Sequence, residues 1–423
     1  MMKNTAILLA CALLIFSGCK DKTFQKYTAN VPVYTDFDEF RSDLGTVKFE
    51  TAKPITQKGN IYFKDNYLFI IDSYKGIHVV DNSNPSSPNN VGYYAVTGIT
   101  GMAIENNYLY INSYIDLVVV DVSNINQPVE AGRVESVFET ALPEHNPNYP
   151  IAEVDPSKGI ITGWVVEEFV SETEPINGCF NCMWLTNENM GAVFDASSGS
   201  SSPSQGISGS ITKFALLNSY LYIMNGNNLV PFDLSNPKEP STTNTIPVWR
   251  EVETLFSYND HIFMGTTTGM LIYNTENRNQ PEQIGAINHV NACDPVVVDG
   301  DYAYVTLRTG NPCSGQANQL DVIDVSSYSN PVLKQSFNLE NPHGLGIINE
   351  HLFICDGSDG LKVFDAQNPE DCGNHLIKNF KNIQATDVIL FGNIAMLIGD
   401  DGLYQYDISD LENINEISQL KFN

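Results

Sequence analysis

The segment Asp116-Leu-Val-Val-Val-Asp-Val-Ser-Asn-Ile-Asn-Gln-Pro128 decides how this chain folds. Its run of branched residues, 117–120, favours a strand buried on both faces, because β-branched side chains pack well on a pleated surface. Asp121 and Ser123 can bond nearby backbone N–H groups and end the strand in a turn. Pro128 cannot donate to a β-ladder, so we expect it at the start of an outer strand. The segment therefore predicts a strand, a turn and an outer strand.

The same pattern recurs along the whole sequence. An apolar run precedes a turn residue at Asp81, Asp121, Asp195, Asp233, Asn274, Asp324, Asp365 and Asp407. Most neighbouring positions in this series are separated by about 40 residues, and the interval from Asp121 to Asp195 is longer. A repeat of this length with several short strands in each unit is typical of a β-propeller.

Several of these runs resemble a known repeat. The sequences LVVVD, IHVVD, DVIDV and LKVFD are similar to the LVIVD repeat, and the resemblance extends over about residues 55–422. That family implies a propeller fold in a secreted or lipid-anchored bacterial protein. It implies no catalytic residues, so the resemblance predicts a fold and a location but no reaction.

Eight repeat units can be counted. They cover about residues 55–97, 98–138, 150–206, 209–248, 250–290, 291–339, 341–382 and 383–422. Tight Asn, Asp and Gly turns between short apolar runs predict antiparallel hairpins, and thus four strands in each unit. The third unit is irregular, because an insertion over 171–206 interrupts it. We predict an all-β propeller of four-stranded blades with eight units, and a seven-bladed ring is the alternative.

The N-terminus has the layout of an export signal. Lys3 precedes a short apolar run, and Ser17-Gly18-Cys19 follows it. The run is too short for a retained membrane helix and fits a signal peptide over 1–18. The small residues before Cys19 resemble a lipobox, which implies a lipid on that cysteine; an ordinary signal peptide is the alternative. We expect an outer-membrane lipoprotein, facing the periplasm or the cell surface.

Residues 19–54 are expected to form a tether between the lipid and a propeller over 55–423. A weak strand, Thr46–Glu50, is expected to help close the ring with the C-terminal residues 415–422. Propeller blades leave strand edges open unless the first and last blades meet.

The strongly negative net charge limits the kinds of molecule that the protein can bind. The chain has 22 basic and 50 acidic residues and a formal net charge of −28. Nucleic acids and anionic headgroups are therefore poor partners for its surface. We expect a monomeric propeller that is attached to a membrane through its lipid and binds a protein or glycan partner.

Six cysteines follow Cys19, an even number that favours disulfides in an exported protein. Cys293 and Cys313 are expected to pair, because they lie at neighbouring ends of antiparallel strands in one unit. Cys179 and Cys182 lie in the insertion, where a local bridge is expected. Cys355 and Cys372 are paired by elimination.

Ligands of propellers bind at the mouth of the central channel, where the innermost strands begin. Aligning the units places Glu253, Asp294, His343 and Asp387 at this level, with Arg250 nearby. Carboxylates beside a histidine suit acid–base chemistry or a metal, but polar groups line any channel mouth. We assign these five residues as candidate ligand-binding residues and expect no cofactor or metal. Acidic turns such as Asp356-Gly-Ser-Asp359 could suggest calcium, but their place in the repeat favours plain hairpin turns.

Two functions follow from the sequence. The first is a non-catalytic binding platform at the outer membrane or cell surface. The second is a propeller hydrolase or lyase that acts on extracellular glycans or other substrates at the channel mouth. The distinctive residues all explain blades and turns, so the sequence favours the first.

Overall fold

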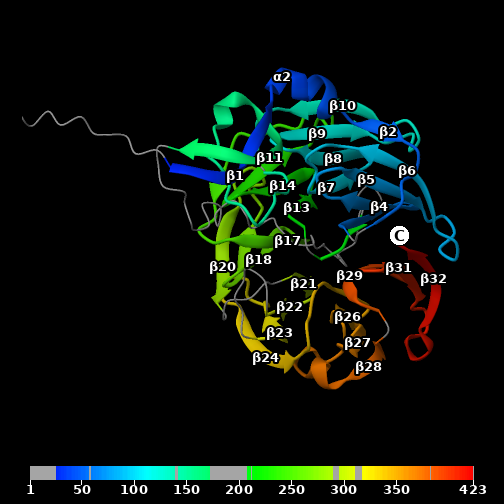
Figure 1. The fold of residues 1–423 in the computed structure, drawn as a ribbon. Helices are drawn as coiled ribbons and strands as arrows, with labels where there is room; N and C mark the ends of the chain where they lie inside the picture. Colours follow the sequence, from blue (N-terminus) through cyan, green and yellow to red (C-terminus); the bar gives the residue numbers. More distant parts are fainter. Residues whose placement is uncertain are drawn as a thin grey trace, which may run out of the picture.

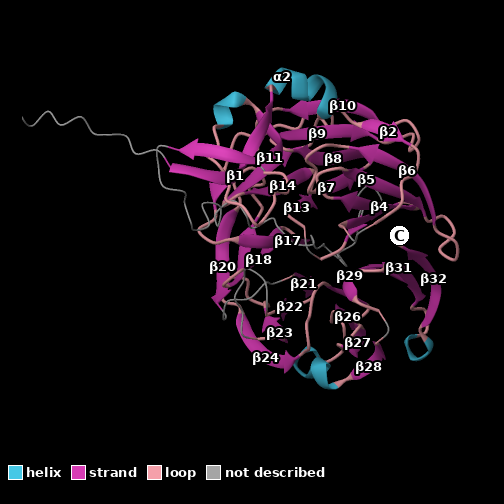
Figure 2. Cartoon of the chain, in the orientation of Figure 1, coloured by secondary structure: helices cyan, strands magenta, loops and turns pink. Residues whose placement is uncertain are grey.

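The chain folds as a ring of seven antiparallel blades (Figure 1). The computed structural model describes residues 25–56, 59–138, 142–171, 207–210, 212–288, 295–309, 317–381 and 383–422. Strands dominate these ranges, and the few helical turns lie at the edge of the ring (Figure 2). The prediction of an all-β propeller with four-stranded blades is confirmed, and the ring has seven blades where we counted eight units.

Each blade is built from four strands that follow one another in the sequence, from the innermost to the outermost. Blade 1 comprises β3 (Ile61–Lys64), β4 (Tyr67–Asp72), β5 (Gly76–Asp81) and β6 (Asn89–Ala95). Blade 2 comprises β7 (Met102–Glu105), β8 (Tyr108–Ser113), β9 (Asp116–Asp121) and β10 (Val129–Val134). Blade 3 comprises β13 (Phe214–Leu217), β14 (Tyr220–Asn225), β15 (Asn228–Asp233) and β16 (Ile246–Pro247).

The other four blades follow the same order. Blade 4 comprises β17 (Val252–Tyr258), β18 (His261–Thr266), β19 (Gly269–Asn274) and β20 (Glu282–Asn288). Blade 5 comprises β21 (Val296–Asp299), β22 (Tyr302–Leu307), β23 (Gln319–Asp324) and β24 (Val332–Asn338). Blade 6 comprises β25 (Leu345–Ile348), β26 (His351–Cys355), β27 (Leu361–Asp365) and β28 (Leu376–Phe380), with the 3-10 turn η3 (Pro369–Asn374) before β28. Blade 7 comprises β29 (Ala385–Phe391), β30 (Ile394–Gly399), β31 (Gly402–Asp407) and β32 (Asn415–Lys421), with the 3-10 turn η4 (Leu411–Asn413) before β32.

The turn residues do what the sequence predicts. The turn between the first two strands of every blade contains a residue with a positive φ, which short hairpin turns require. These residues are Asp65, Asn106, Asn218, Asn259, Gly300, Asn349 and Gly392. At the end of the third strand, a side-chain oxygen accepts from the backbone N–H two residues later, at 2.7–3.0 Å. The acceptors are Asp81, Asp121, Asp233, Asn274, Asp324, Asp365 and Asp407.

The third unit does not form a blade. Its strand β11 (Ile160–Ser171) pairs along its length with β1 (Gln25–Thr35), and this two-stranded ribbon lies outside the ring (Figure 1). The 3-10 turn η2 (Pro156–Lys158) precedes β11. Asp195 and residues 172–206 lie outside the described residues. The apolar residues of 160–170 did predict a strand. Its partner, β1, lies far away in the sequence, and without knowledge of that pairing the strand was assigned to a blade of the ring.

The N-terminal segment is folded onto the ring. After β1 come the helical turns α2 (Phe37–Glu39) and η1 (Phe40–Leu44), followed by β2 (Lys48–Glu50). β2 pairs with β6 on the outer edge of blade 1, so the expected role of this strand in closing the ring with the C-terminus is wrong. Much of the expected tether is therefore ordered structure, and β1 begins at Gln25.

Ring closure depends on packing between blades 7 and 1. Phe63 of blade 1 and Phe391 of blade 7 place their ring centroids 4.9 Å apart. The buried side chains of Asn82 and Gln405 exchange two hydrogen bonds, at 2.9 and 2.7 Å. Ser418 Oγ donates to the carbonyl of Pro85 at 2.6 Å. The ring is thus closed by side chains and not by a strand shared between its two ends.

A short piece of chain also fills the centre of the ring. The strand β12 (Ile207–Ser208) pairs with β3, the innermost strand of blade 1. Ile207 belongs to the apolar cluster shared by blades 1 and 7. Two residues further on, Ser210 Oγ accepts from the Leu345 N–H of blade 6 at 2.9 Å. The segment 207–210 therefore crosses the channel from blade 1 toward blade 6. In the described part of the chain, no helix has the length and apolarity needed to cross a membrane.

Candidate functional site: the channel mouth and the N-terminal cap

The structure places the predicted mouth residues at the same end of neighbouring inner strands. Glu253 lies in β17 of blade 4, His343 comes just before β25 of blade 6, and Asp387 lies in β29 of blade 7. Arg250 precedes β17. Asp294 lies outside the described residues. The contacts below say what each of the described groups can do at this end of the inner strands.

His343 is held by its neighbours. Arg308, just after β22, places its Nη1 2.8 Å from His343 Nδ1. Arg308 Nη1 also lies 3.4 Å from His343 Nε2, so the guanidinium group contacts both ring nitrogens. Asn341 Nδ2 lies 3.2 Å from Nε2, and the His343 carbonyl accepts from Thr306 Oγ1 at 2.7 Å. The histidine thus joins blades 5 and 6 through both its ring and its backbone.

Two cations share the buried carboxylate Glu253 at this level. Burial lowers the pKa of Lys213, and attraction to Glu253 partly opposes that shift. Burial likewise lowers the pKa of Arg308, again with Glu253 opposing. Glu253 is 5% exposed. Lys213, Glu253 and Arg308 come from blades 3, 4 and 5, so the mouth combines charges from three neighbouring blades in partly desolvated surroundings.

Asp387 is not available at the mouth surface. It is completely buried, and Ser210 Oγ donates to its Oδ1 at 3.3 Å. A Cβ atom added at Gly344 would lie 2.1 Å from the same oxygen, so only glycine leaves room for this carboxyl group. Burial raises the pKa of Asp387 well above its usual range. Burial thus favours the protonated form of this acid, which packs against the segment 207–210.

Trp249 and Arg250 lie in the connection between β16, the outer strand of blade 3, and β17, the inner strand of blade 4. Trp249 is 91% exposed. Arg250 Nη2 donates to Asn288 Oδ1 at 2.6 Å, which holds the guanidinium group in place. The sequence analysis missed Trp249, although a tryptophan in a connection between blades has no packing role in the repeat. It missed Arg308 as well, because a residue just past the end of the second strand carries no signal in the repeat pattern.

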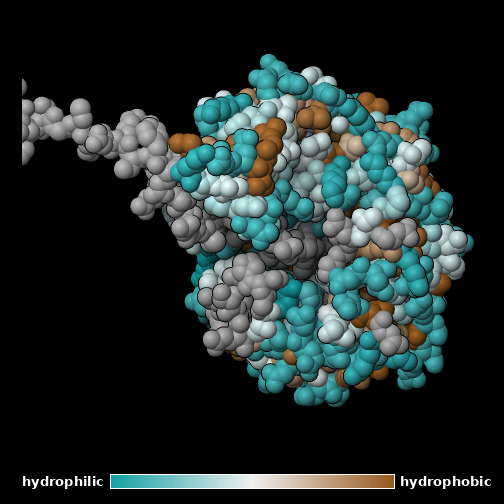
Figure 3. Space-filling view, viewed as in Figure 1, coloured by the Kyte–Doolittle hydropathy of each residue, from teal (hydrophilic) through white to brown (hydrophobic). Residues whose placement is uncertain are grey.

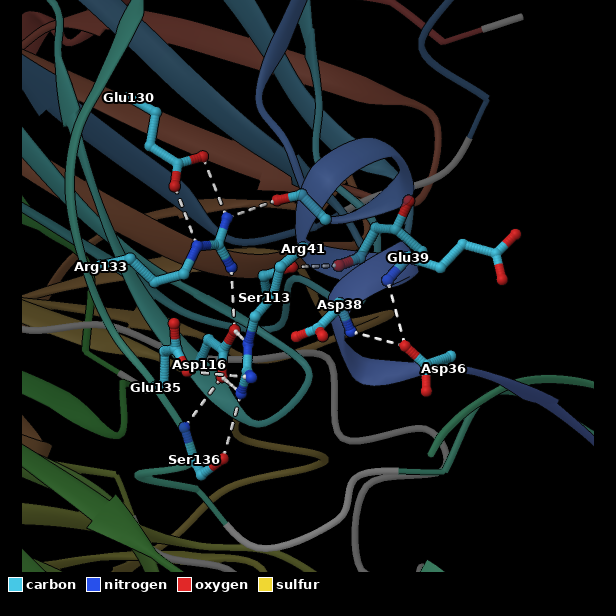
Figure 4. Close-up of polar contacts among 12 residues, drawn as sticks. Asp36, Asp38, Glu39, Arg41, Ser113, Asp116, Glu130, Arg133, Glu135 and Ser136 are labelled. Carbon is cyan, nitrogen blue, oxygen red and sulfur yellow. Dashed lines mark hydrogen bonds and ion pairs between the residues drawn. The ribbon is translucent and has the colours of Figure 1, made fainter. Parts of the chain in front are cut away.

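A second polar cluster attaches the N-terminal segment to blade 2 (Figure 4). We call residues 36–45 the cap. Arg41 donates to the two carboxylate oxygens of Asp116 at 2.9 and 3.0 Å, and Arg133 Nη1 donates to Asp116 Oδ2 at 3.0 Å. The Ser136 N–H is a further donor, at 2.8 Å. Burial would raise the pKa of Asp116, but these donors hold it below its usual range.

Apolar packing supports the same attachment. Phe40 of the cap is completely buried and packs with Tyr114, Ile115 and Ile160. The rings of Phe40 and Tyr114 meet edge to face, with centroids 5.7 Å apart. A buried ion pair with good geometry and a buried aromatic ring together hold the cap firmly on blade 2.

The cysteine predictions have two outcomes. Cys19, Cys179, Cys182, Cys293 and Cys313 lie outside the described residues. Cys355 and Cys372 are both buried free thiols, so the expected bridge between them is not formed. Cys355 packs in the cluster shared with blade 7, and Cys372 packs in the cluster shared with blade 5. They lie on opposite faces of blade 6. Burial raises the pKa of the Cys372 thiol to about 12.

The acidic turn of blade 6 is a structural element. Asp356 is completely buried and accepts from the Asn341 N–H at 2.7 Å and from Lys362 Nζ at 2.5 Å. Lys362 also contacts Asp359 at 2.7 Å. A lysine thus occupies the position between the carboxylates that a cation would need. Across the described residues, no group of three or more His, Cys, Asp or Glu side chains has an arrangement that could hold a metal ion.

Comparison with known proteins agrees with the blade pattern. Four segments match the family model described as LVIVD repeat: residues 58–96, 100–136, 208–245 and 291–339. They coincide with blades 1, 2, 3 and 5. The chain carries LVIVD repeats. Blades 4, 6 and 7 have the same four strands without a match, so the fold of the LVIVD repeat is preserved where its sequence has diverged.

Solved structures share the ring architecture. The periplasmic gluconolactonase PpgL of Pseudomonas aeruginosa is 10% identical, with 86% of this chain and 96% of that chain covered and a TM-score of 0.52. The computationally designed protein Ika8 is 9% identical, with 87% and 88% covered and a TM-score of 0.50. At these identities the likeness shows the fold alone. No curated protein matches the chain.

Proposed function

We propose that this protein is an exported, lipid-anchored propeller that acts as a non-catalytic binding platform at the outer membrane or cell surface. The anchor part of the proposal is supported by the sequence, where a short apolar run leads to Ser17-Gly18-Cys19. Several acyl chains on one cysteine give a stable membrane attachment, whereas a single chain gives a marginal one.

One observation carries the binding part. The groups that could have acted as an acid–base set are committed to holding the ring together. Asp387 is buried against Ser210, and the imidazole of His343 is held by Arg308 and Asn341. A general acid or base must reach the proton that it transfers. Side chains fixed in this way support recognition of a partner more than turnover of a substrate.

The partner that fits best is a protein or a glycan. The net charge of −28 disfavours nucleic acid. Trp249 offers an exposed aromatic surface of the kind that stacks on a sugar ring or fills a pocket of a partner protein. Arg250 adds positive charge beside Trp249 in the same connection. We place the contact at the channel mouth, with Trp249 at its centre.

The anchor is tested by replacing Cys19. The Cys19→Ser protein should move from the membrane to the soluble fraction, while Cys11→Ser, which alters the apolar run but not the lipobox, should stay membrane-bound. Membrane association that survives Cys19→Ser and still needs detergent for release would refute the anchor.

The binding site is tested by crosslinking on intact cells. A partner captured by the natural protein should be lost or reduced at least about ten-fold with Trp249→Ala, which truncates an aromatic hot-spot side chain. His343→Ala should also weaken capture. Asp121→Ala is the matched control, because it changes a turn that every blade repeats. If the folded Asp121→Ala protein loses the partner while Trp249→Ala and His343→Ala retain it, the mouth is not the binding site.

A further inference from the structure

The ribbon formed by β1 and β11 is the largest feature outside the ring, and none of the repeats explains it. It projects beyond the edge of the blades (Figure 1), and apolar atoms form a stripe over β11 (Figure 3). Four of its valines are between 40% and 54% exposed: Val33, Val165, Val166 and Val170. A two-stranded ribbon has little core of its own, so exposed apolar residues on it indicate a surface with a partner.

The far end of the ribbon combines residue types suited to the boundary between lipid and water. Lys26 pairs with Val170, and Tyr27 pairs with Phe169. The rings of Tyr27 and Phe169 meet edge to face, with centroids 5.9 Å apart, and Val170 is 54% exposed. Aromatic rings with a polar edge settle at the headgroup level. A lysine can keep its charge in water, and Lys26 Nζ forms an exposed ion pair with Glu168 at 2.7 Å.

The chain itself brings this end to a membrane. Only residues 20–24 separate Cys19 from Gln25, the first residue of β1. An extended chain spans at most about 3.5 Å per residue, so Gln25 can lie no more than about 20 Å from a lipid-bearing Cys19. A tether of this reach allows the end of the ribbon to contact the headgroup region that borders the hydrocarbon core.

The near end of the ribbon is fixed to the propeller. Asn30 donates to the carbonyls of Asn146 and Tyr149 at 2.9 and 2.7 Å. Tyr34 Oη accepts from the Asp155 N–H at 2.7 Å, and the cap that follows β1 is bound to Asp116. A surface contact at one end of the ribbon therefore fixes the position of the whole ring.

We propose that Lys26, Tyr27, Phe169 and Val170 form a membrane-contact tip that inserts among lipid headgroups beside the lipid on Cys19 and orients the ring. This proposal rests on the proposed lipid anchor. The net charge of −28 on the whole chain directs the tip toward zwitterionic lipid, since an anionic surface would repel the chain.

The test places a photo-crosslinking residue, benzoylphenylalanine, at position 170 of the full lipidated chain. The protein is bound to phosphatidylcholine vesicles that contain radiolabelled phosphatidylcholine, recovered by flotation and irradiated. Position 126 is the control. Asn126 is exposed and lies in the loop that follows Asp121, the last residue of β9, whereas Asp116 is the first residue of that strand. We expect labelled lipid on position 170 at least about ten-fold above position 126. Equal labelling, or crosslinks from position 170 to a second copy or to the chain itself, overturns the proposal.

A longer linker separates real affinity from mere proximity. Ten Gly/Ser residues inserted between Lys22 and Gln25 would let the ring move away from the surface. If the tip binds lipid, labelling at position 170 stays within about two-fold of the original. A fall to the level of position 126 overturns the proposal while leaving the anchor intact. A protein that does not float with the vesicles instead refutes the lipid anchor, so the two failures are distinguishable.

Discussion

The junction between blades 1 and 2 and the junction between blades 7 and 1 join similar surfaces in different ways. Blades 1 and 2 are consecutive in the chain and share one apolar cluster, and the cap covers their common edge, with Tyr74 and Tyr114 beneath it. Blades 7 and 1 are separated by almost the whole chain and share a smaller cluster, to which Ile207 is added from the middle of the sequence. Connectivity stabilises the first junction, whereas the second depends on side chains.

One contact is common to both kinds of junction. In the turn after its third strand, a blade offers a backbone carbonyl to a donor from the preceding blade. Tyr94, Tyr110 and Tyr222 donate to the carbonyls of Ile125, Pro237 and Arg278. At the closing junction, Gln405 donates to the equivalent carbonyl of Pro85 at 3.1 Å. An amide that bonds both Pro85 and Asn82 thus replaces the usual tyrosine at the junction that has no chain connection.

Removing residues 410–423 should have the largest effect. The deletion takes away β32, the Ser418 bond to Pro85, and the packing of Leu420 and Phe422 in the closing cluster. We expect a loss of about 5 kcal/mol or more in the free energy of unfolding, at the upper end of the effects known for local changes. Thermal unfolding should show the whole ring melting earlier. An unchanged melting temperature would show that closure does not depend on these contacts.

Asp116→Ala should release the cap from the junction between blades 1 and 2 and leave the packing between the two blades intact. The change removes the carboxylate that Arg41 and Arg133 share, while Arg41 keeps Glu135 and Arg133 keeps Glu130. The cost should therefore stay below about 3–5 kcal/mol, the cost for a fully buried pair that loses one partner. We expect the cap to detach while the blades stay folded. Hydrogen exchange should rise over residues 36–45 and stay low in β8 and β9. Faster exchange throughout blade 2 would mean that the cap is needed for the blade itself.

Asp387→Asn should sharpen the comparison, because it replaces the buried acid that packs against Ser210 of the segment 207–210. The folded pKa of Asp387 is raised, so the folded state keeps a proton that the unfolded state loses above about pH 4. Stability of the natural protein therefore falls as pH rises, by up to about 1.4 kcal/mol per pH unit until the folded pKa is reached. The amide of the variant cannot titrate, so the variant should gain on the natural protein in urea unfolding as the pH rises above about 4. Parallel pH profiles for the two proteins would contradict the assignment.

Gln405→Ala and Tyr110→Phe compare the two junctions directly. The first leaves the buried amide of Asn82 without its partner and should cost about 1–3 kcal/mol. The second removes a single hydroxyl bond at a chain-connected junction and should cost about 0.5–1.5 kcal/mol. Urea unfolding at one pH measures both. Equal costs would mean that the closing junction depends no more on its side-chain hydrogen bonds than a chain-connected junction does.

Asp121→Ala should have the smallest effect. The Asp121 carboxylate accepts from the Ser123 N–H at 2.9 Å, and its loss should cost about 0.5–2 kcal/mol, as for other lost caps. The hydrogen bonds from Ser123 also lower the pKa of Asp121, so this contribution is present above about pH 4 and is lost as the pH falls below it. The Asp121→Ala and natural proteins should therefore converge in stability in acid. A constant difference would exclude the carboxylate bond as the cause.

The sequence predicts what is repeated and misses what occurs once. The turn aspartates and the hairpin turns follow from local chemistry, so Asp121 and Asn106 lie where expected. The pairing of β1 with β11 depends on residues about 130 positions apart, and no local pattern encodes it. The same holds for the contact of Arg41 with Asp116 and for the path of 207–210 through the channel. At the mouth, alignment of the repeats located Glu253 and His343, but Arg308 and Trp249 lie at positions that the repeat leaves free.

Because each blade contains all four of its own strands, the number of blades is not tied to the ends of the gene. In a ring whose last blade borrows a strand from the N-terminus, adding or losing a repeat would have to preserve that exchange. Here a single in-frame duplication or deletion of about 40 codons adds or removes a complete unit, and only the pair of surfaces that meets across the closing junction must be fitted again. The buried amide pair of Asn82 and Gln405 is where such a change would be selected first.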